Sequence, residues 1–307
     1  MDQSELARIQ AAIVRGKRND VIFAVIGMLC LMIGLMTVAA LFVDMAIKGL
    51  PRLSSDFFFN FPSRRADSAG ILSAWVGSIL VMLVTAFTAV PLGVASGVYL
   101  EEYARRNWVT DIIEINISNL AGVPSIVYGL LALGLFVYEL GLGQSILAAG
   151  LTLGLLILPV VIVSTREAIR SIPSAIREGS YALGATQWQT VRHHVLPYSL
   201  PGILTGVIIG LARAIGETAP IITIGALTFI AFLPPSPIQS TPPYVSFDWL
   251  LAPFTVMPIQ IFNWTSRPEE AFQANAAAAG FVLVIMTLGM NGIAIWLRYR
   301  LRKNIKW

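Results

Sequence analysis

The sequence contains very little cysteine, histidine or charge. Cys30 is the one cysteine among 307 residues, so an internal disulfide is impossible and cysteine usage says nothing about the redox compartment. The two histidines, His193 and His194, are adjacent, and neighbouring side chains on a helix point about 100° apart. They do not form a two-ligand metal face, and no metal site is predicted.

The motifs of several enzyme classes are also absent. The sequence has no H-E-x-x-H, no G-x-S-x-G and no separated histidine that could act as the base for a serine nucleophile. It also lacks the nucleotide-binding motif G-x-x-x-x-G-K-[ST], so ATP hydrolysis is not expected in this chain. These absences argue against an intramembrane enzyme, but they leave a channel or a secondary carrier open.

Apolar residues are abundant where charge is scarce. Hydrophobic residues make up 56% of the chain and charged residues 12%, whereas a soluble domain is about one quarter charged. The apolar residues form six runs, each long enough to cross a hydrocarbon core of about 30 Å as a helix of about 20 residues. The predicted fold is therefore an all-α bundle of six transmembrane helices, near 21–43, 71–99, 112–138, 144–163, 201–231 and 275–297.

The distribution of Lys and Arg predicts the orientation of these spans. With the N-terminus inside, the cytoplasmic segments hold 15 of the 21 basic residues and the outer loops hold five. The isoelectric point of about 9.4 thus reflects topology, and no nucleic-acid partner is expected. The first apolar run is too long for a signal-peptide core and is predicted to stay as a membrane helix. The expected organisation is a cytoplasmic tail (1–20), a first span (21–43), a membrane domain (71–297) and a basic cytoplasmic tail (298–307).

The cytoplasmic segment 164–197 is longer than a simple connector requires. Its residues Glu178, Gly184 and Leu196-Pro197 have the spacing of the EAA loop of ABC importer permeases, although Gly179-Ser180 replaces the two alanines and His194 an aliphatic residue. In that family the loop folds as helix, glycine turn and helix, and docks on a cytosolic ATPase. The resemblance implies that Trp188 packs on the membrane helices. It also implies ATPase-coupling residues, namely Glu178, Gly179, Leu183, Gly184, Ala185 and Thr186.

Four further stretches resemble the permeases of phosphate-specific ABC importers. They are "PLGVASGVYLEEYA" (91–104), "AGVPSIVYGLLALGLFV" (121–137), "ARAIGETAPIITIGAL" (212–227) and "MPIQIFNWTSRPEEAFQANAAAA" (257–279). Glu-Thr-Ala-Pro at 217–220 resembles the PstA type of permease subunit more than the PstC type.

This resemblance implies a MetI-like fold and phosphate import across a prokaryotic cytoplasmic membrane. The expected partners are a PstC-like second permease subunit, a PstB-like homodimeric ATPase that binds ATP and Mg, and an extracytoplasmic PstS-like phosphate-binding protein. This chain itself is expected to hold no cofactor. Tungstate, molybdate or sulfate remains an alternative substrate.

Two charges lie inside the fifth predicted span. Arg213 follows Gly202 by eleven residues, about 17 Å at 1.5 Å per residue, which places it near mid-membrane. An arginine there costs about 2.5–3.5 kcal/mol on insertion scales. Glu217 follows at i+4, and opposite charges about 4 Å apart recover about 4 kcal/mol at an effective dielectric constant of about 20. Structural pairing alone would therefore explain why two charges are present.

A translocation role would explain why any charge is present, because charged residues inside spans usually face a pathway. The resemblance places Arg213 on that pathway, where its guanidinium fork matches phosphate oxygens. Glu217 would then hold the arginine between passages. Thr218 is assigned to the same pathway, and Ser125 could line it or pack between helices. Gly216 and Pro220 are expected to bend the helix at this point.

Overall fold

The computed structural model describes residues 3–238 and 244–302 as helices joined by turns and loops, with no strand in these ranges. The predicted all-α class is confirmed. Parts of the predicted tails and of the outer loop 232–274 lie outside the described residues, namely 1–2, 239–243 and 303–307. The helices are α1 (Gln3–Gly49), α2 (Ser55–Phe59), α3 (Leu72–Val98), α4 (Trp108–Leu120), α5 (Ser125–Ala132), α6 (Ile146–Arg170), α7 (Ser174–Ala182), α8 (Gln187–Thr190), α9 (Leu196–Gly216), α10 (Ala219–Ile224), α11 (Met257–Thr265) and α12 (Glu270–Arg302).

Three helices continue directly into π-helical segments. Tyr99–Tyr103 extends α3, Leu133–Glu139 extends α5, and Val191–Val195 joins α8 to α9. Short 3-10 turns lie at Leu50–Arg52, Ala66–Ser68 and Asp248–Leu251. Because nothing separates α8, the π segment and α9, Gln187–Gly216 is one helical stretch of 30 residues.

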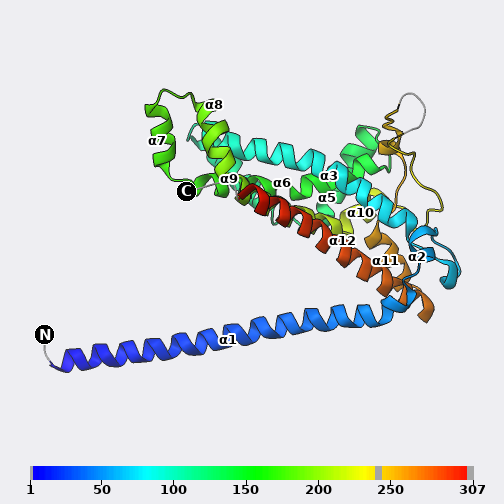
Figure 1. Ribbon diagram of the computed structural model, residues 1–307, viewed down its shortest axis with the longest axis horizontal. Coiled ribbons are helices and arrows are strands. Elements are labelled where there is room, and N and C mark those ends of the chain that lie inside the picture. Colours follow the sequence, from blue (N-terminus) through cyan, green and yellow to red (C-terminus); the bar gives the residue numbers. More distant parts are fainter. Residues whose placement is uncertain (1–2, 239–243, 303–307) are drawn as a thin grey trace.

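The centre of the bundle is formed by α3, α6 and α9, with α12 along one side (Figure 1). Small residues allow close approach of these helices, as is common in membrane bundles. Gly97 of α3 lies against Thr165 of α6, and Gly206 of α9 lies against Ser164 of α6. A side chain at either glycine would force the helices apart.

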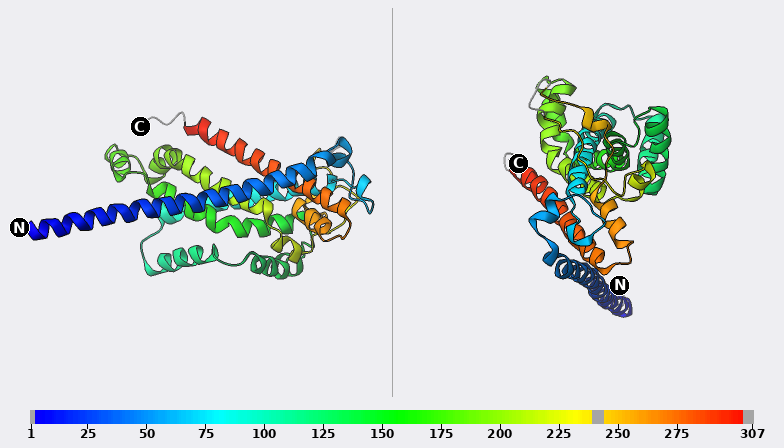
Figure 2. Two further views of the ribbon diagram at one scale, coloured as in Figure 1. Left: turned by 90° about the horizontal axis from the view of Figure 1, so that it is seen from below. Right: turned by 90° about the vertical axis from the view of Figure 1, so that its right-hand side faces the viewer.

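The first helix diverges from this body (Figures 1 and 2). Its apolar stretch is 0% buried, and it contacts α12 near its C-terminal end, where the rings of Phe42 and Phe281 lie 5.4 Å apart. The N-terminal end of α1 and the C-terminal end of α12 lie at the same end of the molecule as α7 and α8, while α2 and α11 lie at the opposite end. This arrangement agrees with an even number of membrane crossings; which end faces the cytoplasm stays a prediction.

Within the described residues, five helical stretches are long and apolar enough to cross a membrane, and a sixth is obtained if α4 and the α5 segment are taken as one bent span. Two predicted spans are therefore wrong as single helices. The stretch predicted at 112–138 is broken between α4 and α5, with the two parts inclined by 106°. The helix predicted at 201–231 ends at Gly216 and is followed by α10 and an irregular segment.

Candidate functional site

The helix that carries Arg213 ends three residues later. Gly216 is the last residue of α9, and Glu217 has an extended backbone with φ −73° and ψ 122°. Pro220 has no amide hydrogen and cannot donate the i→i−4 bond that would continue α9. The short helix α10 runs from Ala219 to Ile224 and is followed by Gly225, whose φ is +98°. Gly216 and Pro220 were expected to bend one helix; in the structure the helix is instead interrupted between them, and α9 and α10 are separate.

The expected ion pair between Arg213 and Glu217 spans this break. Arg213 Nε donates a hydrogen bond to Glu217 Oε1 at 3.1 Å. Glu217 is not on the helical face of Arg213 as the i+4 spacing suggested, because it lies beyond the helix end. Arg213 occupies the last turn of α9, where the partial negative charge of a helix C-terminus favours a cation. Its side chain is 39% exposed and that of Glu217 is 18% exposed.

The second broken span lies against the first. Pro124 precedes α5, and the hydroxyl of Tyr128 donates to the carbonyl of Leu120 at the end of α4, at 2.8 Å. A Cβ at Gly129 of α5 would overlap Thr223 and approach Pro220 Cα of α10 to 2.6 Å. The two interrupted helices therefore pack together through a residue that has no side chain.

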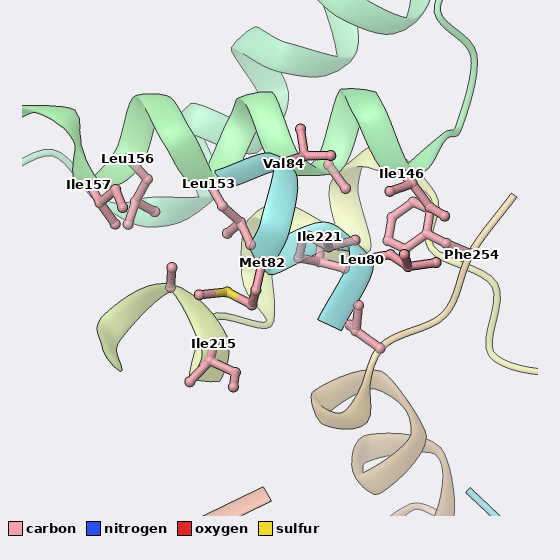
Figure 3. Close-up of a cluster of buried hydrophobic side chains, with 14 of the residues drawn as sticks. Leu80, Met82, Val84, Ile146, Leu153, Leu156, Ile157, Ile215, Ile221 and Phe254 are labelled. Carbon is pink, nitrogen blue, oxygen red and sulfur yellow. The ribbon is translucent and has the colours of Figure 1, made fainter. Parts of the chain in front are cut away.

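Glu217 is one of the residues that line a very small recess, about 10 Å³, which is bordered mainly by apolar residues of α3, α6 and the α9–α10 break. Met82 of α3 lies between Leu153 of α6 and Ile215 at the end of α9 (Figure 3). In surroundings of this kind a charge interacts more strongly than in water, and an unpaired charge is correspondingly unfavourable. The recess is lined by Ser78, Val81, Met82, Leu153, Ala214, Ile215, Glu217, Ile221 and Val256.

The other two predicted pathway residues lie nearby without joining the pair. Thr218 follows Glu217, and its hydroxyl makes only a long contact of 3.5 Å to the carbonyl of Gly216. Ser125 is the first residue of α5 and is half-buried. Among the described residues, no hydrogen bond or ion pair connects either side chain to Arg213 or Glu217.

The predicted coupling loop 164–197 is a helical projection at one end of the bundle (Figure 1). Its first seven residues belong to α6, and the turn between α7 and α8 contains Gly184 with φ +81°. Thr186 caps α8 in a reciprocal bond with Gln189, and the hydroxyls of Ser180 and Thr190 lie 2.9 Å apart.

The predicted docking residues of this loop are accessible. Glu178, Gly179, Leu183, Gly184 and Thr186 are exposed and Ala185 is half-buried. The prediction that Trp188 packs on the membrane helices is wrong, because its side chain is 61% exposed. The reason is that α8 lies with α7 in the part of the chain that projects from the end of the bundle.

A second group of charges was missed from the sequence. In the sequence, Arg166, Arg170 and Arg177 belong to the basic residues of the predicted cytoplasmic segments, whose distribution predicts topology; in the structure each makes an ion pair with a glutamate. The available signal was the presence of glutamates within or directly after apolar runs, since such groups need partners. The pairs are Arg166 with Glu101 and Glu114, Arg170 with Glu101 and Glu167, and Arg177 with Glu102.

Comparison with known proteins gives consistent matches. Residues 89–307 match the family model described as "Binding-protein-dependent transport system inner membrane component". The chain is 34% identical to the "Probable ABC transporter permease protein YqgI" of Bacillus subtilis (strain 168), over 90% of this chain and 94% of that protein. It is 36% identical to the "Phosphate transport system permease protein PstA" of Mycobacterium leprae, over 73% and 69%.

The fold also matches solved structures. The chain superposes on the inward-facing MetNI methionine ABC transporter with a TM-score of 0.58 and 17% identity, over 73% of this chain and 93% of that one. This likeness concerns the fold. Together with the family model, it shows that the chain belongs to the family of binding-protein-dependent transport system inner membrane components, the ABC transporter permeases with the MetI-like fold.

Proposed function

We propose that this chain is a permease subunit of an ATP-driven importer of inorganic phosphate, and that Arg213 contacts the passing anion. The observation that carries this proposal is the Arg213–Glu217 pair at the break of a membrane helix. The phosphate-permease names of several relatives support the choice of anion.

Arg213 is suited to a transient anion contact because most of its donors are free. A guanidinium carries five N–H groups. Among the described residues, Arg213 makes one side-chain hydrogen bond, from Nε to Glu217. A phosphate could therefore accept two hydrogen bonds from the exposed edge of Arg213 while Glu217 remains close. Glu217 competes for the same cation, so it keeps phosphate binding weak enough for release.

Coupling to ATP hydrolysis would use the projecting loop. Its docking residues are Glu178, Gly179, Leu183, Gly184, Ala185 and Thr186, and the Leu183 side chain is 91% exposed. The helical stretch Gln187–Gly216 begins directly after this turn and carries Arg213 in its last turn. A displacement of the loop by an ATPase would thus reach Arg213 through one helix.

Substitution of Gly184 tests the coupling step. Gly184→Trp places a large side chain on the docking turn at a φ of +81°, and we expect the ATPase to stop co-purifying with the permease. Gly141→Trp is the matched control, because Gly141 also has positive φ (+63°) and open space but lies in a different turn. Equal ATPase recovery with both variants would contradict the coupling role.

The remaining components follow from the same proposal. A homodimeric cytosolic ATPase would bind ATP and Mg, a second permease would complete the pathway, and a binding protein would deliver phosphate from outside. This chain would hold no cofactor. It would lie in the prokaryotic cytoplasmic membrane with both termini in the cytoplasm.

The direct test is uptake of labelled phosphate by the complete transporter in proteoliposomes with ATP inside and binding protein outside. We expect saturable phosphate uptake that excess sulfate, molybdate or tungstate does not suppress. Uptake of one of those anions in place of phosphate would assign a different substrate. Transport that proceeds without ATP would instead indicate a channel or secondary carrier.

A further inference from the structure

The end of α3 nearest the projecting loop is connected to that loop through Arg177. Arg177 of α7 contacts Glu102 Oε1 through Nη2 at 2.6 Å and through Nε at 3.0 Å. Its Nη1 donates to the carbonyl of Ile172 at 2.9 Å, and Nη2 donates to the carbonyl of Ile169 at 3.1 Å. Every nitrogen of this guanidinium is thus committed, and its orientation is fixed.

The partner of Arg177 is also held from a second direction. The Glu102 side chain is 6% exposed, and its backbone carbonyl accepts a hydrogen bond from the side-chain amide of Gln187 in α8. The preceding residue, Glu101, accepts from Arg170 Nη2 of α6 at 3.1 Å. Side chains from α6, α7 and α8 therefore all form hydrogen bonds to the same π-helical extension of α3.

The opposite part of α3 reaches the candidate pathway. Ser78, Val81 and Met82 line the same small recess as Glu217. The helix runs without interruption from Leu72 through Val98 into the segment that contains Glu102. A displacement of its loop-side end therefore moves the residues beside Glu217, because a continuous, well-packed helix does not deform freely.

We propose that Arg177 and Glu102 are positioning residues that make α7 and α3 move as one body, so that displacement of the loop reaches the α3 residues beside Glu217. This inference rests on the proposed docking of an ATPase on the loop. It adds a second route from the loop to the pathway, separate from the direct one through α8 and α9.

Two cysteine reporters separate movement of the loop from movement of α3. In a Cys30→Ser background, one reporter is Ser174→Cys at the exposed start of α7 and the other is Met82→Cys beside Glu217. The assembled transporter is labelled with a maleimide, with and without ATP plus vanadate. In the parent, we expect labelling of both cysteines to change with nucleotide.

Arg177→Lys keeps the charge but loses the planar fork, and we expect the nucleotide-dependent change at Met82→Cys to fall at least about twofold while that at Ser174→Cys persists. Arg192→Lys is the matched control, because Arg192 is exposed on the same loop and makes no ion pair within the described part of the chain. Arg177→Glu should abolish the Met82 response, and Glu102→Gln, which keeps one acceptor oxygen but loses the charge, should reduce it as Arg177→Lys does.

A full Met82 response in Arg177→Lys and in Arg177→Glu would overturn the inference. If Arg177→Glu does not assemble, Arg177→Lys and Glu102→Gln decide the question, and a full Met82 response in both would overturn the inference. Failure of the proposed function gives a different result, namely no nucleotide-dependent labelling at Ser174→Cys even in the parent. That outcome would remove the coupling role of the loop and this inference with it.

Discussion

Two of the arginine–glutamate contacts in the described part of the chain are built in opposite ways. Arg213 makes a single hydrogen bond to Glu217 across a helix break, and 39% of its side chain is exposed. Arg177 makes four hydrogen bonds, two of them to Glu102, and its side chain is 20% exposed. Arg213 therefore has N–H groups without a hydrogen-bond acceptor in the described part of the chain, whereas every guanidinium nitrogen of Arg177 makes a hydrogen bond.

This difference indicates what each contact can do. A guanidinium with free N–H groups can accept an incoming anion without first losing its partner, whereas a saturated one can only hold its position. Removing one member of a buried, hydrogen-bonded pair is strongly destabilising, and the loss is larger when more hydrogen bonds are left unmade. We therefore propose that the Arg213–Glu217 pair contacts the transported anion. The Arg177–Glu102 pair instead holds α7 and the end of α3 in a fixed relative position.

Removal of the glutamates should give the largest contrast in stability. Glu102→Ala leaves Arg177 without its carboxylate in a buried setting, and we expect a loss of about 3 kcal/mol in the stability of the assembled complex. Glu217→Ala leaves a single hydrogen bond of Arg213 unmade, and we expect a smaller loss of about 1.5 kcal/mol. Thermal unfolding of the purified complex measures both, and equal losses would break the comparison.

The packing of the two broken helices should matter next. Gly129→Ala places a Cβ against Thr223 and Pro220, and overpacking of this kind lowers stability by about 1–3 kcal/mol. We expect slower transport as well, since α5 and α10 would be pushed apart. Gly134→Ala is the control, because a Cβ there meets nothing within 4 Å. Matching behaviour of the two variants would show that this contact does not shape the site.

The smallest effect is expected at a surface pair. Lys48 and Asp44 are joined at 2.8 Å, but their side chains are 61% and 57% exposed. Lys48→Ala should change the stability of the complex by less than about 0.5 kcal/mol and leave transport unchanged. A loss of stability as large as that of Glu102→Ala would mean that burial does not determine how much each ion pair contributes to stability.

Hydropathy predicted where helices lie but not where they break. The breaks occur near Pro124 and Pro220, and proline disfavours helix continuation. Proline alone does not identify them, because Pro91, Pro159 and Pro201 lie inside continuous helices. Whether neighbouring groups satisfy the freed backbone depends on packing, which a single sequence does not show.

From the sequence, an ion pair could be predicted only where its two residues are close together in the chain. Arg213 and Glu217 are four residues apart, so their contact follows from spacing. Arg177 and Glu102 are separated by 75 residues, and several other glutamates were equally plausible partners on charge alone. Only the packing of α7 against the end of α3 selects Glu102.

The central claim is that Arg213 contacts the transported anion and does more than neutralise Glu217. The most direct measurement is phosphate uptake by Arg213→Leu with Glu217→Leu, normalised to the amount of assembled transporter. This double variant leaves no unpaired charge, so we expect normal assembly but a decrease in uptake of about tenfold or more, as for loss of a charged hydrogen bond. Arg213→Lys should retain partial activity, because it keeps the charge without the planar fork. Near-normal uptake by the double leucine variant would contradict the account and reduce the pair to a structural contact.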